Sequence, residues 1–383
     1  MSISLINQRW IYVKRPVAEV GTEHYERIEQ PVDAQLAEGE VLIANRYISV
    51  DPYMRIQQSA SPNWEAPHPL NQLQQSGVVG QVLLSNSNQF REGDWVGAYT
   101  GWELYSRVHA NALTRLDPDM APVSSALGVL GMPGRTAWFG LMEAGQPNPG
   151  ETVFVSGASG AVGSLVVQFA KKAGCKVVAF AGSVEKCRWL KTIGADAAIN
   201  YRQFHKPEHL RDHLIAQSLS VDVYFDNVGG MITDALVPII NRRARIVICG
   251  QMSQYNGQLD EVSLGPRFLH HVLYQRATIQ GILARDYNHR MDEMVAAVGP
   301  WIRDGSLVAE ETIVDGFRQL PWYLASLFDR SSHGKLIVRV EDERALDAQP
   351  NGTPAKQKRP FALLPALFMN NSRNRPRVSS ASG

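Results

Sequence analysis

The sequence predicts an α/β protein in which a doubly wound domain with a parallel sheet is inserted into a mostly β domain that curls into a partial barrel. Three observations support this fold class. Short β runs broken by turn residues fill the first 120 residues, strands and helices alternate after residue 152, and a last β run at 335–341 is like the first part of the chain. We therefore expect the chain to leave the β domain, build a complete α/β domain and return.

Shifts in composition give the expected domain boundaries. Small-residue, helix-like sequence begins after Pro122. The segment 344–383 contains five prolines and seven Lys or Arg against one Asp, which is typical of a disordered basic tail, with FALLPALFM (361–369) as a candidate docking segment. The prediction is a β-rich domain over 1–125 and 305–341, a doubly wound domain over 126–304, and a basic tail over 342–383.

Each element follows from a local pattern, because β-branched and aromatic runs predict strands and apolar residues at i, i+3, i+4 and i+7 predict helices. The first part is expected to form strands at 9–13, 40–50, 77–85 and 94–102, followed by packed helices over 122–145. The second part is expected to form strands at 152–156, 176–180, 196–200, 221–228 and 245–250, and helices around 162–169, 184–193, 207–217, 230–240 and 289–304.

The composition of the 383 residues is that of a globular protein, with 44% apolar and 20% charged residues. Thirty-eight Lys and Arg face 37 Asp and Glu, so the net charge of +1 gives no electrostatic reason to expect a nucleic-acid or membrane partner. Three cysteines are too few for a disulfide framework, and the first residues lack a signal-like apolar core. We expect a cytoplasmic location.

The first strand of the α/β part runs into a glycine-rich turn and then a helix. Gly157, Gly160 and Gly163 stand three residues apart in SGASGAVG (156–163). Glycine is needed in such a turn because a Cβ would keep backbone N–H groups away from a pyrophosphate, which the helix N-terminus also attracts. The pattern predicts dinucleotide binding, and tight helix–strand packing is the alternative reason for the glycines.

The end of the second parallel strand indicates which dinucleotide is bound. An NAD site uses an Asp or Glu there to hold the ribose 2′-hydroxyl, but KVVAF (176–180) is followed by Ala-Gly-Ser. Ser183 is a helix-capping residue, and Lys186 comes one turn into the helix. A helix N-terminus with a nearby lysine favours a 2′-phosphate, so the sequence predicts NADP(H) as the cofactor.

The β part lacks a convincing set of metal ligands. Residues 1–125 contain no cysteine, and their histidines show no paired spacing: His24, His68 and His109. No metal site is therefore predicted. Three further histidines follow a helical i, i+4, i+8 spacing, for which a solvated helix face is preferred to metal binding: His205, His209 and His213.

Several stretches together are similar to one family. These are SVDPYMR (49–55), 127–164, AGSVEKCRWL (181–190), FDNVGG (225–230) and ICGQMSQYN (248–256). From about residue 5 to 341 the chain resembles the zinc-independent medium-chain dehydrogenase/reductases, in the branch of prostaglandin, 2-alkenal and curcumin reductases. The resemblance implies that the β domain is of the GroES-like type.

The resemblance also implies site residues. Lys186 matches a lysine that contacts the 2′-phosphate, and Tyr201 matches a tyrosine beside the adenosine phosphate. Tyr255 matches a tyrosine near the substrate carbonyl. Ser332 stands where the family usually has an Asn. From the motifs and the resemblance together, the expected cofactor-binding residues are Gly157, Gly160, Ala161, Val162, Gly163, Ser183, Lys186, Tyr201, Asn227, Cys249, Gly250, Gln251, Ser253, Tyr255 and Ser332.

The implied reaction is reduction of the carbon–carbon double bond of a small α,β-unsaturated ketone or aldehyde by NADPH, with hydride going to the β carbon. Tyr255 is the expected donor to the enolate oxygen, with the cofactor's ribose hydroxyl as a second candidate and mere packing as the alternative role for Tyr255. Tyr53 is expected to wall the pocket, and a homodimer is expected. Two alternative functions stay open, namely a quinone reductase of the zeta-crystallin type and a non-catalytic NADP-binding protein.

Overall fold

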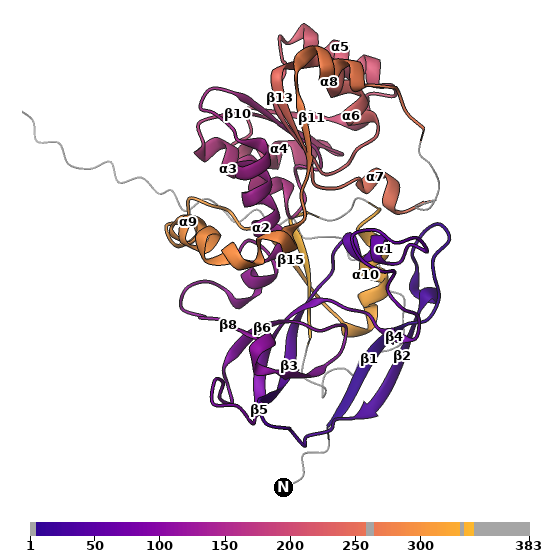
Figure 1. The fold of residues 1–383 in the computed structure, drawn as a ribbon, viewed down its shortest axis with the longest axis vertical. Helices are drawn as coiled ribbons and strands as arrows, with labels where there is room; N and C mark the ends of the chain where they lie inside the picture. The colour runs from indigo at the N-terminus through magenta and orange to yellow at the C-terminus, as the bar shows by residue number, and fades with distance from the viewer. Residues whose placement is uncertain (1–4, 258–263, 330–332, 341–383) are drawn as a thin grey trace, which may run out of the picture. The chain divides into compact units, whose positions relative to one another are not determined.

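The computed structural model describes residues 5–257, 264–329 and 333–340 and confirms the mixed α/β fold class (Figure 1). Its parallel sheet has six strands in the order β11-β10-β9-β12-β13-β14, and every neighbouring pair is parallel. The bounds are β9 (Thr152–Val155), β10 (Lys176–Ala181), β11 (Ala197–Asn200), β12 (Val221–Asp226), β13 (Ile240–Ile248) and β14 (Thr278–Gly281). From β9 the chain adds β10 and β11 on one side, and then crosses over to add β12, β13 and β14 on the other side. The boundary between β9 and β12 is therefore the topological switch point, where open α/β sheets bind their ligands.

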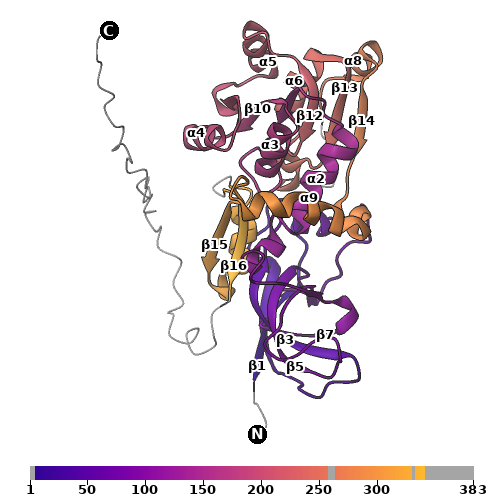
Figure 2. The same ribbon diagram turned by 90° about the vertical axis from the view of Figure 1, so that its left-hand side faces the viewer.

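Helices cover both faces of this sheet (Figure 2). Along β9, Val153 and Val155 pack with one set of helices and Phe154 with the other, as expected for a central strand that is buried on both faces. The first set is α2 (Met132–Phe139), α3 (Gly163–Lys172), α4 (Val184–Thr192) and α9 (Met291–Arg303), and the second includes α5 (Pro207–Ala216) and α6 (Met231–Leu236). No helix in the described part of the chain is long and apolar enough to cross a membrane.

A second, largely antiparallel sheet has the order β15-β16-β3-β5-β6-β8, and β7 pairs with β3. Its bounds are β3 (Glu40–Ser49), β5 (Gly77–Ser85), β6 (Trp95–Tyr99), β7 (Tyr105–His109), β8 (Thr114–Arg115), β15 (Glu311–Asp315) and β16 (Lys335–Arg339). Because β16 pairs with β3, the chain's last described strand returns to the sheet that the first part of the chain builds. A smaller sheet joins β1 (Ile6–Tyr12), β2 (Tyr25–Pro31) and β4 (Gln72–Leu73).

Two expected segments differ from the structure. The helix expected over 230–240 ends at Leu236, because Pro238 follows in a 3-10 turn and β13 already begins at Ile240. The helical region expected over 122–145 consists of a 3-10 helix (Val123–Leu127), α2 and a π-helical turn (Gly140–Gly145). The remaining short α-helices are α1 (Tyr53–Gln57), α7 (Met252–Tyr255), α8 (Leu269–Gln275) and α10 (Leu320–Ser326).

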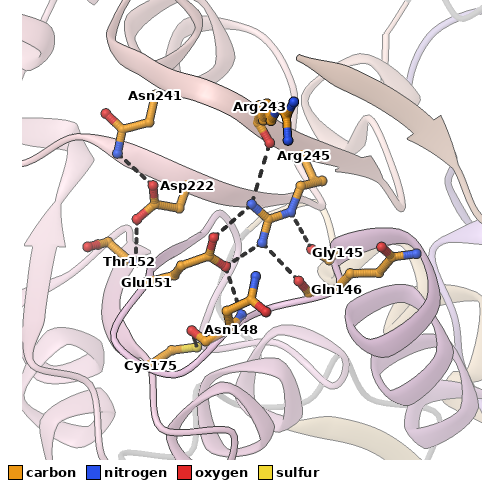
Figure 3. A network of polar contacts seen from close by, with 10 residues as sticks. All are labelled: Gly145, Gln146, Asn148, Glu151, Thr152, Cys175, Asp222, Asn241, Arg243 and Arg245. Atoms are coloured by element: carbon orange, nitrogen blue, oxygen red, sulfur yellow. Dashed lines mark hydrogen bonds and ion pairs between the residues drawn. The ribbon is translucent and has the colours of Figure 1, made fainter. Parts of the chain in front are cut away.

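One guanidinium joins β13 to the end of the π-helical turn (Figure 3). Arg245 donates to the carbonyl oxygens of Gly145 at 2.8 Å and Gln146 at 2.9 Å, and Nη1 lies 3.0 Å from Oε1 of Glu151. Glu151 directly precedes β9, so this network lies at the amino end of the strand and leaves its carboxyl end to the phosphate turn.

Candidate functional site

Asp226 organises the carboxyl ends of three neighbouring strands. It ends β12 and is fully buried, and its carboxylate accepts hydrogen bonds from Ser156 Oγ after β9 at 2.8 Å and from Gln251 Nε2 after β13 at 3.3 Å. Further donors to the same carboxylate are Tyr224, Val228, Gly229 and Thr233. Because a buried carboxylate needs many donors, Asp226 holds these loops in place around the switch point.

The predicted phosphate turn has the backbone that its glycines allow. Gly157 has φ of +57°, a region that L side chains rarely adopt, and a Cβ on Gly163 would lie 2.4 Å from the Gly157 carbonyl oxygen. Ala161 and Val162 lead directly into α3, which begins at Gly163. The turn therefore brings the amino end of a helix to the carboxyl end of β9, and this arrangement fits a pyrophosphate.

The last described segment of the chain lies against this turn. Gly334 N–H donates to the Ser159 carbonyl oxygen at 2.9 Å, and Gly160 and Gly334 form an isolated bridge. Ser332, which the sequence predicts to bind the cofactor, lies outside the described residues.

The predicted 2′-phosphate residues gather at the ends of β10 and β11. Ser183 caps α4, with its Oγ accepting from Lys186 N–H at 3.2 Å, as the sequence predicts. A Cβ on Gly182 would lie 3.4 Å from the Tyr201 hydroxyl and 3.2 Å from Arg202 Nε. Arg202 is an exposed cation that the sequence reasoning missed. Its position directly after Tyr201, in the 3-10 turn (Tyr201–Gln203) that follows β11, the strand next to β10, is the signal that indicates it.

The predicted nicotinamide-side loop lies against the end of β12. Asn227 is tied to β9 because its Nδ2 donates to the Ser156 carbonyl oxygen at 2.7 Å. The amides of Cys249 and Gly250 donate to the Asp226 carbonyl oxygen at 2.9 and 3.0 Å, and Ser253 Oγ donates to the Val228 carbonyl oxygen at 2.6 Å. Burial raises the pKa of the Cys249 thiol to about 12, so this sulfur is a protonated packing group at neutral pH.

The Tyr255 hydroxyl turns back toward the start of its own short helix. It accepts a hydrogen bond from Gln251 N–H at 2.7 Å. Burial raises the pKa of Tyr255 to about 12, so the hydroxyl keeps its proton at neutral pH. Since the hydroxyl accepts from the backbone, its proton is still available to a further acceptor.

Helix α1 of the β part contacts the chain just after Tyr255. Arg55 is fully buried and donates to the carbonyl oxygens of Ala18 at 2.9 Å and Gly257 at 3.4 Å. Tyr53, at the start of the same helix, lies with its hydroxyl 3.4 Å from that of Tyr99, and burial raises its pKa. The structure thus joins the helix that carries Tyr53 to the chain two residues after Tyr255.

A buried ion pair joins the segment before α1 to the segment beside the phosphate turn. Lys335 Nζ lies 3.1 Å from an Asp51 carboxylate oxygen and donates to the Val50 carbonyl oxygen at 2.9 Å. Desolvation lowers the pKa of Lys335, and the adjacent Asp51 opposes that shift.

No group of three or more His, Cys, Asp or Glu with metal-binding geometry occurs among the described residues. The histidines of the β part serve local contacts instead, such as His68 Nε2 at 3.1 Å from the Leu73 carbonyl oxygen. His209 and His213 are exposed on α5.

Sequence comparison finds relatives that span nearly the whole described chain. Residues 8–116 match the family model described as the N-terminal domain of oxidoreductase, and residues 161–299 match the one described as zinc-binding dehydrogenase. The chain is 36% identical over 340 residues to the NADPH-dependent curcumin reductase of Escherichia coli, covering 87% of this chain and 97% of the relative. It is 38% identical over 308 residues to the NADP(+)-dependent 2-alkenal reductase of Nicotiana tabacum, covering 79% of this chain and 88% of the relative.

A solved structure agrees with these relatives. CurA from Vibrio vulnificus in complex with NADPH superposes with a TM-score of 0.81 at 34% identity, covering 90% of this chain and 100% of that one. Identity at this level over nearly full lengths shows the family. The chain belongs to the medium-chain dehydrogenase/reductase family of oxidoreductases, in the zinc-independent branch that contains the curcumin, 2-alkenal and prostaglandin reductases.

Proposed function

We propose that this protein uses NADPH to reduce the carbon–carbon double bond of α,β-unsaturated ketones and aldehydes. The observation that carries the proposal is the Tyr255 hydroxyl, a protonated donor in the loop that follows β13 at the carboxyl edge of the sheet. Two relatives, a curcumin reductase and a 2-alkenal reductase, support the same reaction class.

The cofactor is NADP(H), and the residues around the turn and the strand ends fit it. The glycine turn takes the pyrophosphate through backbone N–H groups and the α3 amino end. The 2′-phosphate is bound by Ser183, Lys186, Tyr201 and Arg202. No acidic residue that would repel this phosphate stands at the end of β10. Asn227 and the loop from Cys249 to Tyr255 border the nicotinamide half. The bound nicotinamide supplies the hydride that reaches the β carbon of the substrate.

The protein's own contribution is to stabilise the charge that grows on the carbonyl oxygen. Gln251 N–H fixes the Tyr255 hydroxyl, and Asp226 in turn holds the Gln251 side chain. A fixed donor costs no reorganisation when the enolate forms, so it lowers the barrier more than a water would. Tyr53 and Tyr99 form a wall of the substrate site. After hydride transfer, the α carbon of the enolate receives a proton, which completes the reduction.

Turnover assays test this function against its alternatives. We expect NADPH oxidation with 2-alkenals and enones, and a product saturated at the former double bond by NMR. Oxidation of NADPH by quinones with no reduction of any enone would favour the quinone reductase alternative. No turnover with either class, despite tight NADPH binding, would favour a non-catalytic role.

We also propose that two copies pair through β14. This strand is the edge of the parallel sheet, and all four of its residues are exposed. Helix α8 precedes it in the chain and exposes the apolar side chains of Leu269, Leu273 and Tyr274. A two-fold axis would pair β14 with its own copy and cover both apolar surfaces, which is the self-complementary interface that dimers use.

A further inference from the structure

A continuous set of short contacts runs from the phosphate turn toward the substrate side of the molecule. It begins at Gly334, whose N–H donates to the Ser159 carbonyl oxygen at 2.9 Å and which forms a bridge with Gly160. The next amide in the chain, that of Lys335, donates to the Glu310 carbonyl oxygen at 2.9 Å. Backbone hydrogen bonds therefore hold this segment on both sides, so a shift of the turn would move Lys335 with it.

The Lys335 side chain continues this connection as a buried ammonium group. Lys335 is 3% exposed, and its Nζ lies 3.1 Å from Asp51 Oδ1. The same nitrogen donates to the carbonyl oxygens of Val50 at 2.9 Å and Leu336 at 2.8 Å. An ammonium has three protons, and these three acceptors use all of them, so the position of Nζ is fixed.

Asp51 connects the ion pair to α1. Its carboxylate also accepts a hydrogen bond from Ser49 Oγ, and its carbonyl oxygen accepts one from Met54 N–H at 3.2 Å, in the first turn of the helix. Helix α1 carries Tyr53, which forms part of the wall of the proposed substrate site. The ion pair thus lies between the pyrophosphate side and the substrate side of the proposed reaction site.

Stability alone does not account for a charged pair at this position. Taking a lysine and an aspartate out of water costs free energy, and an apolar pair of similar size is often at least as stable as a buried ion pair. Asp51 is 4% exposed, so both partners are removed from water. Unlike an apolar pair, this ion pair fixes the distance and the direction between two segments that are far apart in the chain.

We propose that the Asp51–Lys335 ion pair couples the phosphate turn to α1 and positions that helix. When a pyrophosphate fills the turn, Gly334 and Lys335 are fixed, and Asp51 then holds the first turn of α1 where the substrate needs it. The phosphate-bearing half of the cofactor thereby tightens substrate binding without any contact between the nicotinamide and the substrate. The inference rests on the proposed function and adds to it a connection between its two binding sites.

Hydrogen exchange of the α1 amides tests this coupling without turnover and without substrate. The probe is ADP with a 2′-phosphate, because it carries the pyrophosphate but neither the nicotinamide nor its ribose. We expect saturating probe to slow exchange in Tyr53–Gln57 at least about 5-fold, the low end of the range for coupled sites. Adenosine 2′-phosphate, which lacks the pyrophosphate, should leave this exchange unchanged. Equal exchange with and without the probe would overturn the inference.

Asp51→Asn/Lys335→Met tests whether the ion pair itself transmits the effect. This double variant leaves no buried charge, so it should fold and bind the probe, but the probe should no longer slow exchange in α1. If the double variant does not fold, Asp51→Asn alone should weaken the response. A response of the original size in either folded variant would overturn the role assigned to the pair.

A second ion pair on the same strand provides the matched control. Arg339 of β16 and Asp315 of β15 lie 2.6 Å apart, and both side chains are exposed. Asp315→Asn/Arg339→Met removes the two charges of this pair, as the first double variant does for the buried one. It should keep the full response of α1 to the probe, because this pair does not contact the segment before α1.

The outcomes separate this inference from the function on which it rests. Because the exchange measurement contains no substrate, it decides the coupling even if the protein reduces no enone and the proposed function fails. If enones are reduced, calorimetry should show that the probe tightens binding of the saturated ketone product at least about 5-fold, and by linkage the ketone should tighten the probe equally. A ketone Kd that the probe leaves unchanged would overturn the inference and leave enone reduction intact.

Discussion

The Tyr255 hydroxyl accepts one hydrogen bond from the backbone, and this leaves its own proton available for donation. The Gln251 amide donates to it, while burial keeps it protonated with a pKa of about 12. A tyrosine that only packed on the cofactor would not need a backbone group to orient its oxygen. The contact fixes the direction of the hydroxyl and supports the donor role over the packing role.

Replacing Tyr255 by Phe tests the donor role. The change removes one hydroxyl and almost no packing volume, so loss of the donor should lower kcat about 10²- to 10³-fold while the Kd for NADPH stays near its original value. Steady-state kinetics and a fluorescence titration measure the two quantities. A kcat within about threefold of the original, well short of that range, would show that Tyr255 packs and that another group stabilises the enolate.

The 2′-phosphate residues give a second prediction at the scale of single side chains. Lys186→Ala should raise KM for NADPH about 10- to 150-fold relative to KM for NADH, because one charge-assisted contact is lost. Arg202→Ala should act in the same direction and also weaken inhibition by 2′-AMP, which tests the phosphate contact without turnover.

Lys191→Ala provides the control, since this exposed lysine lies in the last turn of α4, away from the capped end. It should leave both Michaelis constants unchanged. Equal use of NADPH and NADH by the unmodified protein would contradict the assignment of these residues.

At the scale of elements, the Arg245–Glu151 network joins β13 to the π-helical turn and the start of β9 (Figure 3). Burial by itself raises the pKa of Glu151, but the hydrogen bonds from Arg245 and the Asn148 amide outweigh burial and hold the pKa below its usual value. A carboxylate with a lowered folded-state pKa stabilises the fold above its unfolded-state pKa and stops doing so as the pH falls.

Glu151→Gln should therefore lower the free energy of unfolding by about 1–3 kcal/mol at pH 7. The difference from the unmodified protein should persist down to about pH 5 and shrink below about pH 4.3, the ordinary pKa of a glutamate. Thermal or urea unfolding across this pH range measures it. A difference that grows as the pH falls would mean that Glu151 is not the titrating group.

At the scale of the whole molecule, the exposed edge strand β14 and α8 predict a dimer. Leu273→Arg places a charge on a side chain that is 71% exposed and should convert the dimer to a monomer without loss of folding. Light scattering after size-exclusion chromatography measures the mass. Ile215→Arg, at a 54% exposed apolar position on α5, is the matched control and should stay dimeric. A monomeric unmodified protein would refute the pairing.

Local patterns were sufficient for much of the fold and part of the site. Strand 77–85 was predicted with the bounds that β5 has, and Ser183 was predicted to cap α4, because both depend on residues within a few positions. Strand β2, YERIEQP, was missed because its polar residues hide the alternation. The edge strand β14, TIQG, is too short to give a periodic signal.

The sequence by itself determined the glycine turn, the absence of an acid after β10 and the apolar strands, because turn geometry, capping and burial periodicity are properties of neighbouring residues. Only the tertiary structure decided which distant residues meet. Arg202 comes beside Gly182 because β11 pairs with β10, and Asp226 reaches Ser156 and Gln251 because β12 lies between β9 and β13. The order of the strands and the contacts between distant loops depend on how much surface the whole chain buries. No local sequence pattern carries that information.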